Sequence, residues 1–271
     1  MDLHLFYVTL AGYALAMGLV LGAVLVPGER IGRAAFYAAL AGFAVHTLAI
    51  VARYVQAGTL PATNLFEVTL FFTWALVLVY LIVEGRMRTR VLGAFVIPFV
   101  FIALASASHL PKEAAGLSPA LRSVWFRFHA LFILGGHAAF VLAGLVSLLY
   151  LFHERALKAK RMTGWTRRLP PLETLDQLSF RIVAVGFPLV TVGIVSGSIL
   201  ATHAWGLLWF WDPKQVLGFG TWLLYGLIMS GRIVLGWRGH RASLLGVTGL
   251  GLILAAFIGV ALLYKGLHSF A

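Results

Sequence analysis

The chain has 271 residues, of which 61% are hydrophobic and only 11% are charged. This composition excludes an ordinary water-soluble domain and indicates an integral membrane protein. Lysine and arginine number 21 against 9 aspartates and glutamates, and cysteine is absent. The absence of cysteine excludes disulfides, thiolate metal ligands and a cysteine nucleophile. Any chemistry must therefore use histidine, acidic or aromatic side chains, or a bound cofactor.

Apolar runs of about 20 residues, separated by charges or turns, predict the membrane spans. They favour an all-α, polytopic transmembrane bundle of about eight helices that forms a single membrane domain over residues 1–271. The first run is too long for the apolar part of a signal peptide and follows no basic region, so we interpret it as a retained span. The expected spans lie near residues 4–26, 34–57, 67–84, 91–108, 129–152, 180–203, 216–235 and 243–265.

The positive charges sort by side when the connections between these spans are assigned alternately to the two faces. One side receives 15 lysines and arginines and the other only 6. Basic connections stay on the cytoplasmic side, so both termini are predicted on the outer, periplasmic-type face of a bacterial-type plasma (inner) membrane. The basic surplus is thus a topology signal rather than a sign of nucleic-acid binding. The outer set is Arg53, Lys112, Arg122, Arg127, Lys214 and Lys265.

Two further features concern the helices themselves. The long inner connection, about residues 153–178, is basic and is predicted to be a solvated connector.

Glycines inside the spans are expected to let helices pack closely, because small residues allow transmembrane backbones to approach. These glycines are Gly135, Gly136, Gly193, Gly197, Gly246, Gly249 and Gly251.

Residues 204–215, AWGLLWFWDPKQ, are the densest group of large aromatic side chains in the sequence. Trp205, Trp209 and Trp211 stand beside Asp212 and Lys214 in this predicted outward loop. A single tryptophan at the edge of a span is most often an interfacial anchor. Three within seven residues exceed that need, and indole rings suit a flat aromatic ligand. We therefore interpret this loop as a binding element.

The histidines can be sorted by the predicted topology. His129 begins the fifth span and His268 follows the eighth, so both fall on the same face as the tryptophan loop. Neutral imidazoles are common metal ligands, and a haem held by two axial histidines requires such a pair beside an aromatic surface. The alternative for each is an interfacial histidine bonded to a backbone carbonyl. His46, in the middle of the second span, either binds a ligand or bridges two helices. His137 is a packing residue or a weaker second candidate.

Several stretches resemble one family closely. These stretches are WGLLWFWDPKQV from residue 205, GTLPATNLFE at 58–67, the FHALFILGGH run around His129 and the C-terminal YKGLHSFA. They are similar to the membrane proteins of cytochrome c assembly that carry the tryptophan-rich WWD haem-handling motif. The subgroup resembled is the CcsA or ResC type rather than CcmC. The chain departs from the family pattern at Ser230, where a transmembrane histidine is expected, at Thr59 and at Gln215.

The resemblance implies roles for individual residues. His129 and His268 would be the axial ligands of a haem, haem b, at the outer face. Trp205, Trp209, Trp211 and Asp212 would enclose it, Lys214 could pair with a propionate, and His46 could hold haem within the membrane. The implied function is presentation of haem for thioether attachment to the C-x-x-C-H segment of apocytochrome c. The chain would act as a component of a cytochrome c synthase together with a ResB/CcsB-type membrane partner.

Two other functions share many of these residues. One is a non-enzymatic, HemX-like haem-binding membrane protein linked to tetrapyrrole synthesis. The other is a transporter of a different amphiphile, with the tryptophans as a rim toward lipid. The transporter hypothesis predicts that His129 and His268 are dispensable.

Overall fold

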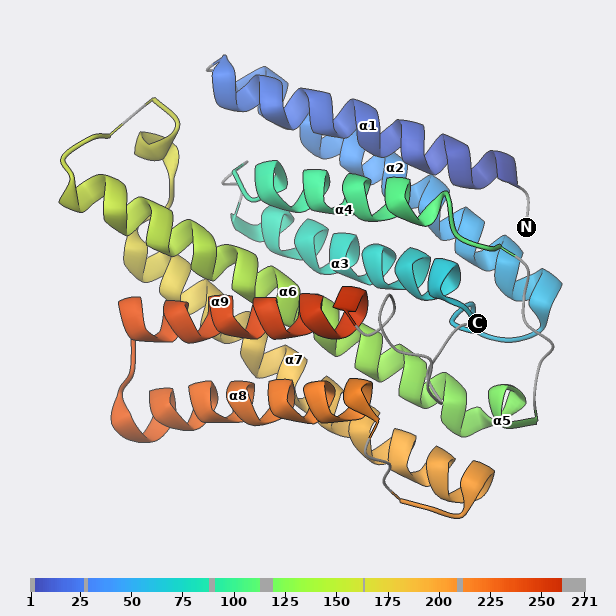
Figure 1. Cartoon of the computed structure of the whole chain (residues 1–271). Helices are drawn as coiled ribbons and strands as arrows, with labels where there is room; N and C mark the ends of the chain where they lie inside the picture. The colour runs from blue at the N-terminus through green and yellow to red at the C-terminus, as the bar shows by residue number, and fades with distance from the viewer. Residues whose placement is uncertain are drawn as a thin grey trace.

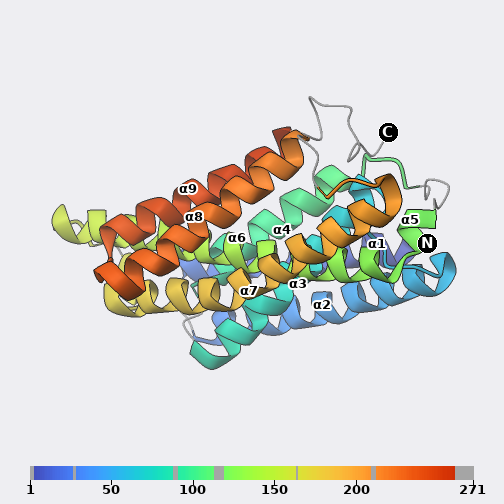
Figure 2. The same ribbon diagram turned by 90° about the horizontal axis from the view of Figure 1, so that it is seen from below.

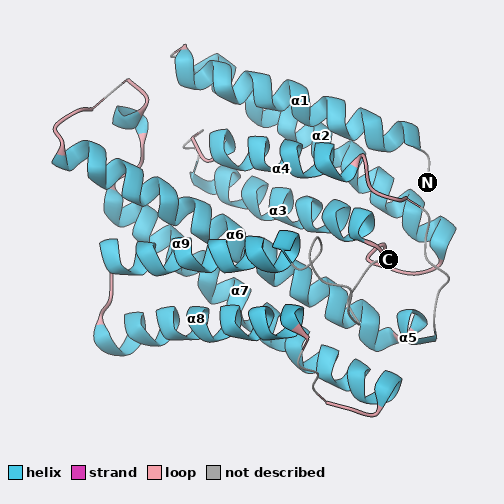
Figure 3. Ribbon diagram, in the orientation of Figure 1, coloured by secondary structure: helices cyan, strands magenta, loops and turns pink. Residues whose placement is uncertain are grey.

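The computed structural model of the chain describes residues 3–26, 29–87, 91–112, 119–162, 164–208 and 212–259. Within these ranges every regular element is a helix (Figure 3). The elements are α1 (Leu3–Leu25), α2 (Glu29–Ala57), α3 (Leu65–Met87), α4 (Gly93–Ala107), the short α5 (Pro119–Arg122), α6 (Val124–Lys158), the 3-10 turn η1 (Thr166–Arg168), α7 (Leu172–Trp205), α8 (Pro213–Leu235), α9 (His240–Leu254) and the π-helical turn η2 (Ala255–Gly259).

The eight predicted spans correspond one to one with α1, α2, α3, α4, α6, α7, α8 and α9, so the predicted all-α bundle is confirmed. Seven of these helices are long and apolar enough to cross a membrane, α9 together with the start of η2. The exception, α4, has 15 residues and contains Pro98. At 1.5 Å per residue it reaches about 22 Å, which is shorter than a typical hydrocarbon core.

The helices form two groups that meet at α6 (Figures 1 and 2). Helices α1 to α4 pack among themselves on one side, while α7, α8 and α9 lie on the other. Helix α6 contacts α7 most extensively and also packs against α3 and α9. Its middle is accordingly buried on nearly all sides, and Leu142, Val146 and Leu149 have no exposed surface. A helix that is apolar all round is suited to this central position.

The inner connection differs from the prediction. Residues 153–178 were expected to be a solvated connector, but α6 continues to Lys158 and α7 already begins at Leu172. Because α6 has 35 residues and α7 has 34, both exceed the roughly 20 that a bilayer requires. Hydropathy alone placed the helix ends where charges begin, whereas charged residues such as Arg155 and Lys158 are accepted in the last turn of α6.

Glycines bring the helices together at several of the predicted positions. A Cβ on Gly136 would meet Val190 of α7 at 2.5 Å, and one on Gly249 would meet the Tyr225 ring at 2.7 Å. Gly193 and Gly246 are equally close to their neighbours, so the packing prediction is confirmed for these positions. It is wrong for Gly135 and Gly251, because among the described residues no heavy atom beyond the glycine's own helix backbone lies within 4 Å of such a Cβ.

Ionic contacts join the helices at one end of the bundle. Asp176 at the start of α7 lies 2.7 Å from Arg232 of α8 and accepts the backbone N–H of Gly239 at 2.8 Å. Glu154 of α6 contacts His240 at the start of α9 at 2.5 Å. These contacts fix the end at which α6 and α8 terminate, and the opposite end carries the tryptophan loop (Figure 1).

Candidate functional site

Two of the features that the sequence analysis placed on one face, His129 and the described flanks of the tryptophan loop, lie at one end of the bundle. There α2, α4 and α7 end, and α3, α6 and α8 begin (Figure 1). His129 lies in the second turn of α6, and the tryptophan loop connects the end of α7 to the start of α8. The alternation of helix directions therefore confirms that His129 and the described flanks of the loop share an end. Its location on the outer face of the membrane stays a prediction from the charges.

His129 is half-buried against α7. Its Nδ1 lies 2.8 Å from the backbone oxygen of Gly193. Because a carbonyl oxygen can only accept, the neutral ring carries its proton on Nδ1, and Nε2 is the nitrogen that can coordinate a metal. Metal-binding histidines commonly donate their other ring N–H to such an acceptor. The local chemistry of His129 thus fits an axial ligand.

The tryptophan loop begins where α7 is stopped. Gly206 adopts a left-handed conformation, with φ of 73°, and its N–H donates to the oxygen of Thr202 at 2.9 Å. Such a C-cap favours glycine because a Cβ is disfavoured at positive φ. The preceding Trp205 is 45% exposed. Trp209 and Trp211, the other two predicted site residues of this loop, lie outside the described residues.

The loop ends at a helix cap. Asp212 is buried, and its side chain accepts the N–H of Lys214 at 2.8 Å as the N-cap of α8. Pro213 follows at the first helical position, where its missing N–H costs nothing. The Asp-Pro-Lys sequence therefore has a structural role in addition to the binding role expected for Asp212. This cap was not predicted, although Asp followed by Pro is a recognised signal for a helix start.

Lys214 and His129 lie at similar depth along the bundle. Phe140 of α6 and Tyr225 of α8 stack with ring centroids 3.7 Å apart, and the two helices run in the same direction. His129 precedes Phe140 by eleven positions, as Lys214 precedes Tyr225, which places each about 16 Å from the stacked pair. His129 and Lys214 therefore lie at a similar depth on two different helices of the bundle.

His137 has the character of a packing residue. It is buried, its Nδ1 donates to the oxygen of Ile133 at 2.7 Å, and its ring meets Phe140 and Phe257 edge-on. His137 faces η2 through Phe257, whereas His129 faces α7 through Gly193. The two imidazoles point to different neighbours, as their spacing on one helix predicts.

His46 lies in the other half of the molecule. Its side chain is fully buried, its Nδ1 lies 3.2 Å from the hydroxyl of Tyr13 on α1, and no atom of the described residues makes a hydrogen bond to its buried Nε2. A buried polar atom without a partner is costly, which is consistent with a site that a ligand completes. Through its contact with Tyr13, His46 also bridges α1 and α2. Both roles considered for His46 are therefore compatible with its position. Ser230 lies exposed on α8, which packs against α7 and α9 rather than α2.

His268 and the segment around it, the second predicted axial ligand, fall outside the described residues. What the structure shows is the direction of approach. Helix α9 runs along α6, with Gly144 against Leu250, and it continues through η2 toward the end where His129 lies (Figure 1). The order of the helices is therefore compatible with the pairing of His129 and His268 that the topology predicts.

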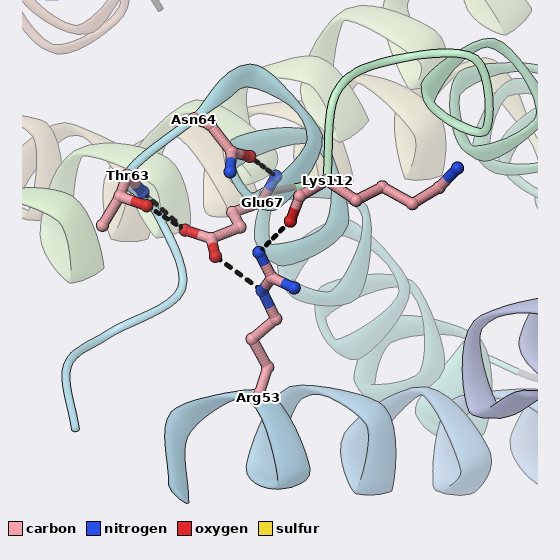
Figure 4. A network of polar contacts seen from close by, with 5 residues as sticks. All are labelled: Arg53, Thr63, Asn64, Glu67 and Lys112. Carbon is pink, nitrogen blue, oxygen red and sulfur yellow. Dashed lines mark hydrogen bonds and ion pairs between the residues drawn. The ribbon is translucent and has the colours of Figure 1, made fainter. Parts of the chain in front are cut away.

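A buried ionic network at the same end was missed by the sequence analysis (Figure 4). Arg53 of α2 donates from Nε to Oε1 of Glu67 on α3 at 2.6 Å, and the two side chains are 8% and 1% exposed. The other oxygen of Glu67 accepts both the N–H and the hydroxyl of Thr63, at 2.8 and 2.6 Å. Asn64 caps α3 by accepting the Glu67 N–H at 2.8 Å. The GTLPATNLFE stretch is therefore a rigid, internally bonded loop.

The network reaches the connection that leads to α6. Arg53 also donates to the backbone oxygen of Lys112, after α4, at 2.6 Å. Thr59 donates to the oxygen of Leu121 in α5 at 3.3 Å, and Ser123 then caps α6 by accepting the N–H of Trp125. This arrangement ties the loop between α2 and α3 to the helix that carries His129. The Asn-x-x-Glu spacing could have indicated the cap, but nothing in the sequence pairs Glu67 with Arg53.

The chain is a multi-pass membrane protein. At one end of its helical bundle lie the oriented imidazole of His129, the tryptophan loop and Lys214. Comparison with known families gives the class a name. The model of the cytochrome C assembly protein family matches residues 62–268, which is most of the chain. The chain therefore belongs to this family, in agreement with the resemblance seen in its motifs.

Curated relatives span nearly the same length. The cytochrome c biogenesis protein CcsA of Synechococcus elongatus is 32% identical over 279 residues, which covers 85% of this chain and 86% of the relative. CcsA of Guillardia theta is 33% identical over 244 residues, with coverages of 83% and 81%. CcsA of Prochlorococcus marinus is 35% identical over 255 residues, with coverages of 83% and 80%.

Proposed function

We propose that this protein handles haem in cytochrome c maturation, holding it at the outer face of the plasma membrane and presenting it for attachment to apocytochrome c. The observation that carries the proposal is the orientation of His129, whose Nδ1 is bonded to a backbone oxygen at the end where the tryptophan loop begins. Membership of the cytochrome C assembly family, and relatives named cytochrome c biogenesis protein, support it.

In this proposal His129 and His268 coordinate the haem iron from opposite sides. Trp205, Trp209 and Trp211 enclose the macrocycle, because indole rings pack well on a flat aromatic ligand. Asp212 fixes the loop by capping α8. Two imidazoles suffice because haem, here haem b, brings four nitrogen donors of its own.

Two accessory residues complete the proposed site. Lys214, at the depth of His129, offers a cation for a haem propionate. His46 is a candidate for a second position within the membrane, since its buried Nε2 has no partner among the described residues.

The chemistry is the addition of two thiols to two vinyl groups. In each addition a carbon–sulfur bond forms at one vinyl carbon and the thiol hydrogen goes to the other, so no electrons are gained or lost. This chain has no cysteine, and both thiols come from the C-x-x-C-H segment of the apocytochrome. The contribution of this chain is to fix the plane of the haem and the direction of its vinyl edge, which accelerates reaction by proximity and orientation.

A membrane partner of the ResB/CcsB type belongs to this proposal. The outer connection 58–64, which is described without a gap, is held by hydrogen bonds from Thr63 to Glu67. In this proposal a separate outward domain, supplied by the partner, receives the apocytochrome.

A maturation assay tests the proposal. A bacterial host without its own cytochrome c assembly genes would express this protein, its membrane partner and a reporter apocytochrome, and covalent haem would be detected by peroxidase staining after denaturing electrophoresis. Wild-type protein should yield stained reporter and His129→Ala should yield almost none. His109→Ala, an exposed histidine at the same end, is the matched control and should behave as wild type. Normal staining with His129→Ala would refute the assignment.

A further inference from the structure

The imidazole of His129 is seated on the backbone of α7 rather than on another side chain. Its Nδ1 lies 2.8 Å from the oxygen of Gly193. One turn further along α7, a Cβ built on Gly197 would lie 2.5 Å from Nδ1 and 2.8 Å from Cε1 of the same ring. Real Cβ atoms do not approach other atoms so closely, so the ring occupies space that only a glycine at position 197 leaves open.

Gly193 permits the hydrogen bond in a different way, because it lets α6 and α7 approach each other closely. A Cβ at this position would lie 2.9 Å from the backbone nitrogen and 3.0 Å from Cα of Ile133 on α6. These are backbone atoms, which cannot rotate away as a side chain end can. A larger residue would therefore push α6 from α7 and lengthen the bond between Gly193 and His129. The two glycines thus act on one imidazole, one by contact and the other by setting the distance between the helices.

The same helix also leads into the tryptophan loop. From Gly197 to Trp205 is eight residues of continuous helix, about 12 Å, before Gly206 ends it. Helix α7 therefore fixes both the imidazole plane and the position from which the loop departs. A rigid element that orients a ligand and its surroundings together is what a binding site requires.

We propose that Gly193 and Gly197 are positioning residues for haem binding, which set the tautomer and the ring orientation of His129 and so the coordination of the iron. This inference rests on the proposed function, because it assumes that His129 is an axial ligand. It adds that the α7 backbone orients the imidazole of His129. It also adds that glycine is needed at positions 193 and 197 to hold this imidazole and not only to pack the helices.

The experiment compares glycine variants that differ only in what they touch. Gly197→Ala disturbs the imidazole directly. Gly136→Ala disturbs the same pair of helices at Val190, about 10 Å along α6 from His129, without touching the ring. Gly135→Ala places its new methyl group more than 4 Å from every described atom outside its own helix backbone, so it reports on the substitution itself. Each purified protein in detergent would be titrated with haem, and the ferric complex examined by electron paramagnetic resonance.

The expected results separate positioning from packing. Gly197→Ala should weaken haem binding about 10- to 100-fold, the usual effect of removing support from a metal ligand, and should shift the low-spin g values. Gly135→Ala should match wild type. Gly136→Ala should lower thermal stability yet keep the wild-type g values in its folded fraction. Wild-type affinity and g values in Gly197→Ala, or the same g shift in Gly136→Ala, would overturn the inference.

A second comparison covers the case in which Gly197→Ala is poorly folded, and it distinguishes failure of this inference from failure of the proposed function. In a His129→Ala background, Gly197→Ala should cause no further loss of haem affinity, because both changes act on one contact. Additive losses would show that Gly197 acts elsewhere and would overturn the inference alone. If His129→Ala itself binds haem as wild type does, the axial-ligand assignment fails, and the inference fails with it.

Discussion

Glu67 offers the largest predicted effect of a single substitution on stability. Its carboxylate, 1% exposed, holds Arg53, and it also accepts two hydrogen bonds from Thr63. Glu67→Ala would leave the Arg53 guanidinium buried, with the backbone oxygen of Lys112 as its remaining acceptor among the described residues. Removing one partner of a buried ion pair costs about 3–5 kcal/mol. We expect a loss of this size in the free energy of unfolding.

Reversible unfolding in mixed micelles, followed by circular dichroism, would measure this loss. Lys158→Ala is a matched control, because it removes a pair with Glu154 in which the lysine is 70% exposed, and such pairs contribute about 0.5 kcal/mol or less. The double variant Arg53→Met with Glu67→Met should recover much of the loss, since no charge is then left unpaired. A decrease of less than about 1 kcal/mol in the free energy of unfolding of Glu67→Ala would refute the reasoning, because removal of a buried carboxylate with these partners is expected to exceed that value.

Two smaller effects follow from the cap and the helix packing. Asp212→Ala should lower stability by about 0.5–2 kcal/mol through loss of the α8 cap, whereas Asp212→Asn should keep the cap; equal thermal stability of the two variants would contradict the capping role. Gly249→Leu should destabilise by about 1–3 kcal/mol or more, because it overpacks against Tyr225, while Gly251→Leu should be nearly neutral, and both can be read from the same unfolding assay. An equal cost for the two leucine variants would show that the Gly249 contact is not the cause.

The fold was predictable because the bilayer imposes it. Apolar runs of sufficient length must be helices in a membrane, where every backbone polar group needs an internal partner. Alternating charge then predicted which connections share a face of the membrane. The end of α6 and the start of α7 were not predictable from hydropathy, because these turns carry charges that pair at the helix termini or across helices, as Asp176 does with Arg232.

The candidate site was predictable in part. Topology alone brought His129 and the tryptophan loop to one end, because helix direction decides which connections meet. The hydrogen-bond partner of His129 could not be predicted, because it is the backbone oxygen of Gly193 and every residue has such an oxygen. The pairing of Arg53 with Glu67 was hidden for a related reason: the two residues stand 14 positions apart across a loop whose shape depends on the contacts they make.

The central claim is that haem iron is coordinated by His129 and His268. The visible absorption spectrum of the detergent-purified protein, as isolated and after dithionite, tests it most directly beside His129→Ala and His268→Ala. We predict a low-spin ferrous spectrum typical of two histidine ligands in the wild type, and a spectrum that is lost or becomes high-spin in each variant. If both variants keep the wild-type spectrum, or if the wild type binds no haem even with its partner co-expressed, the claim is contradicted.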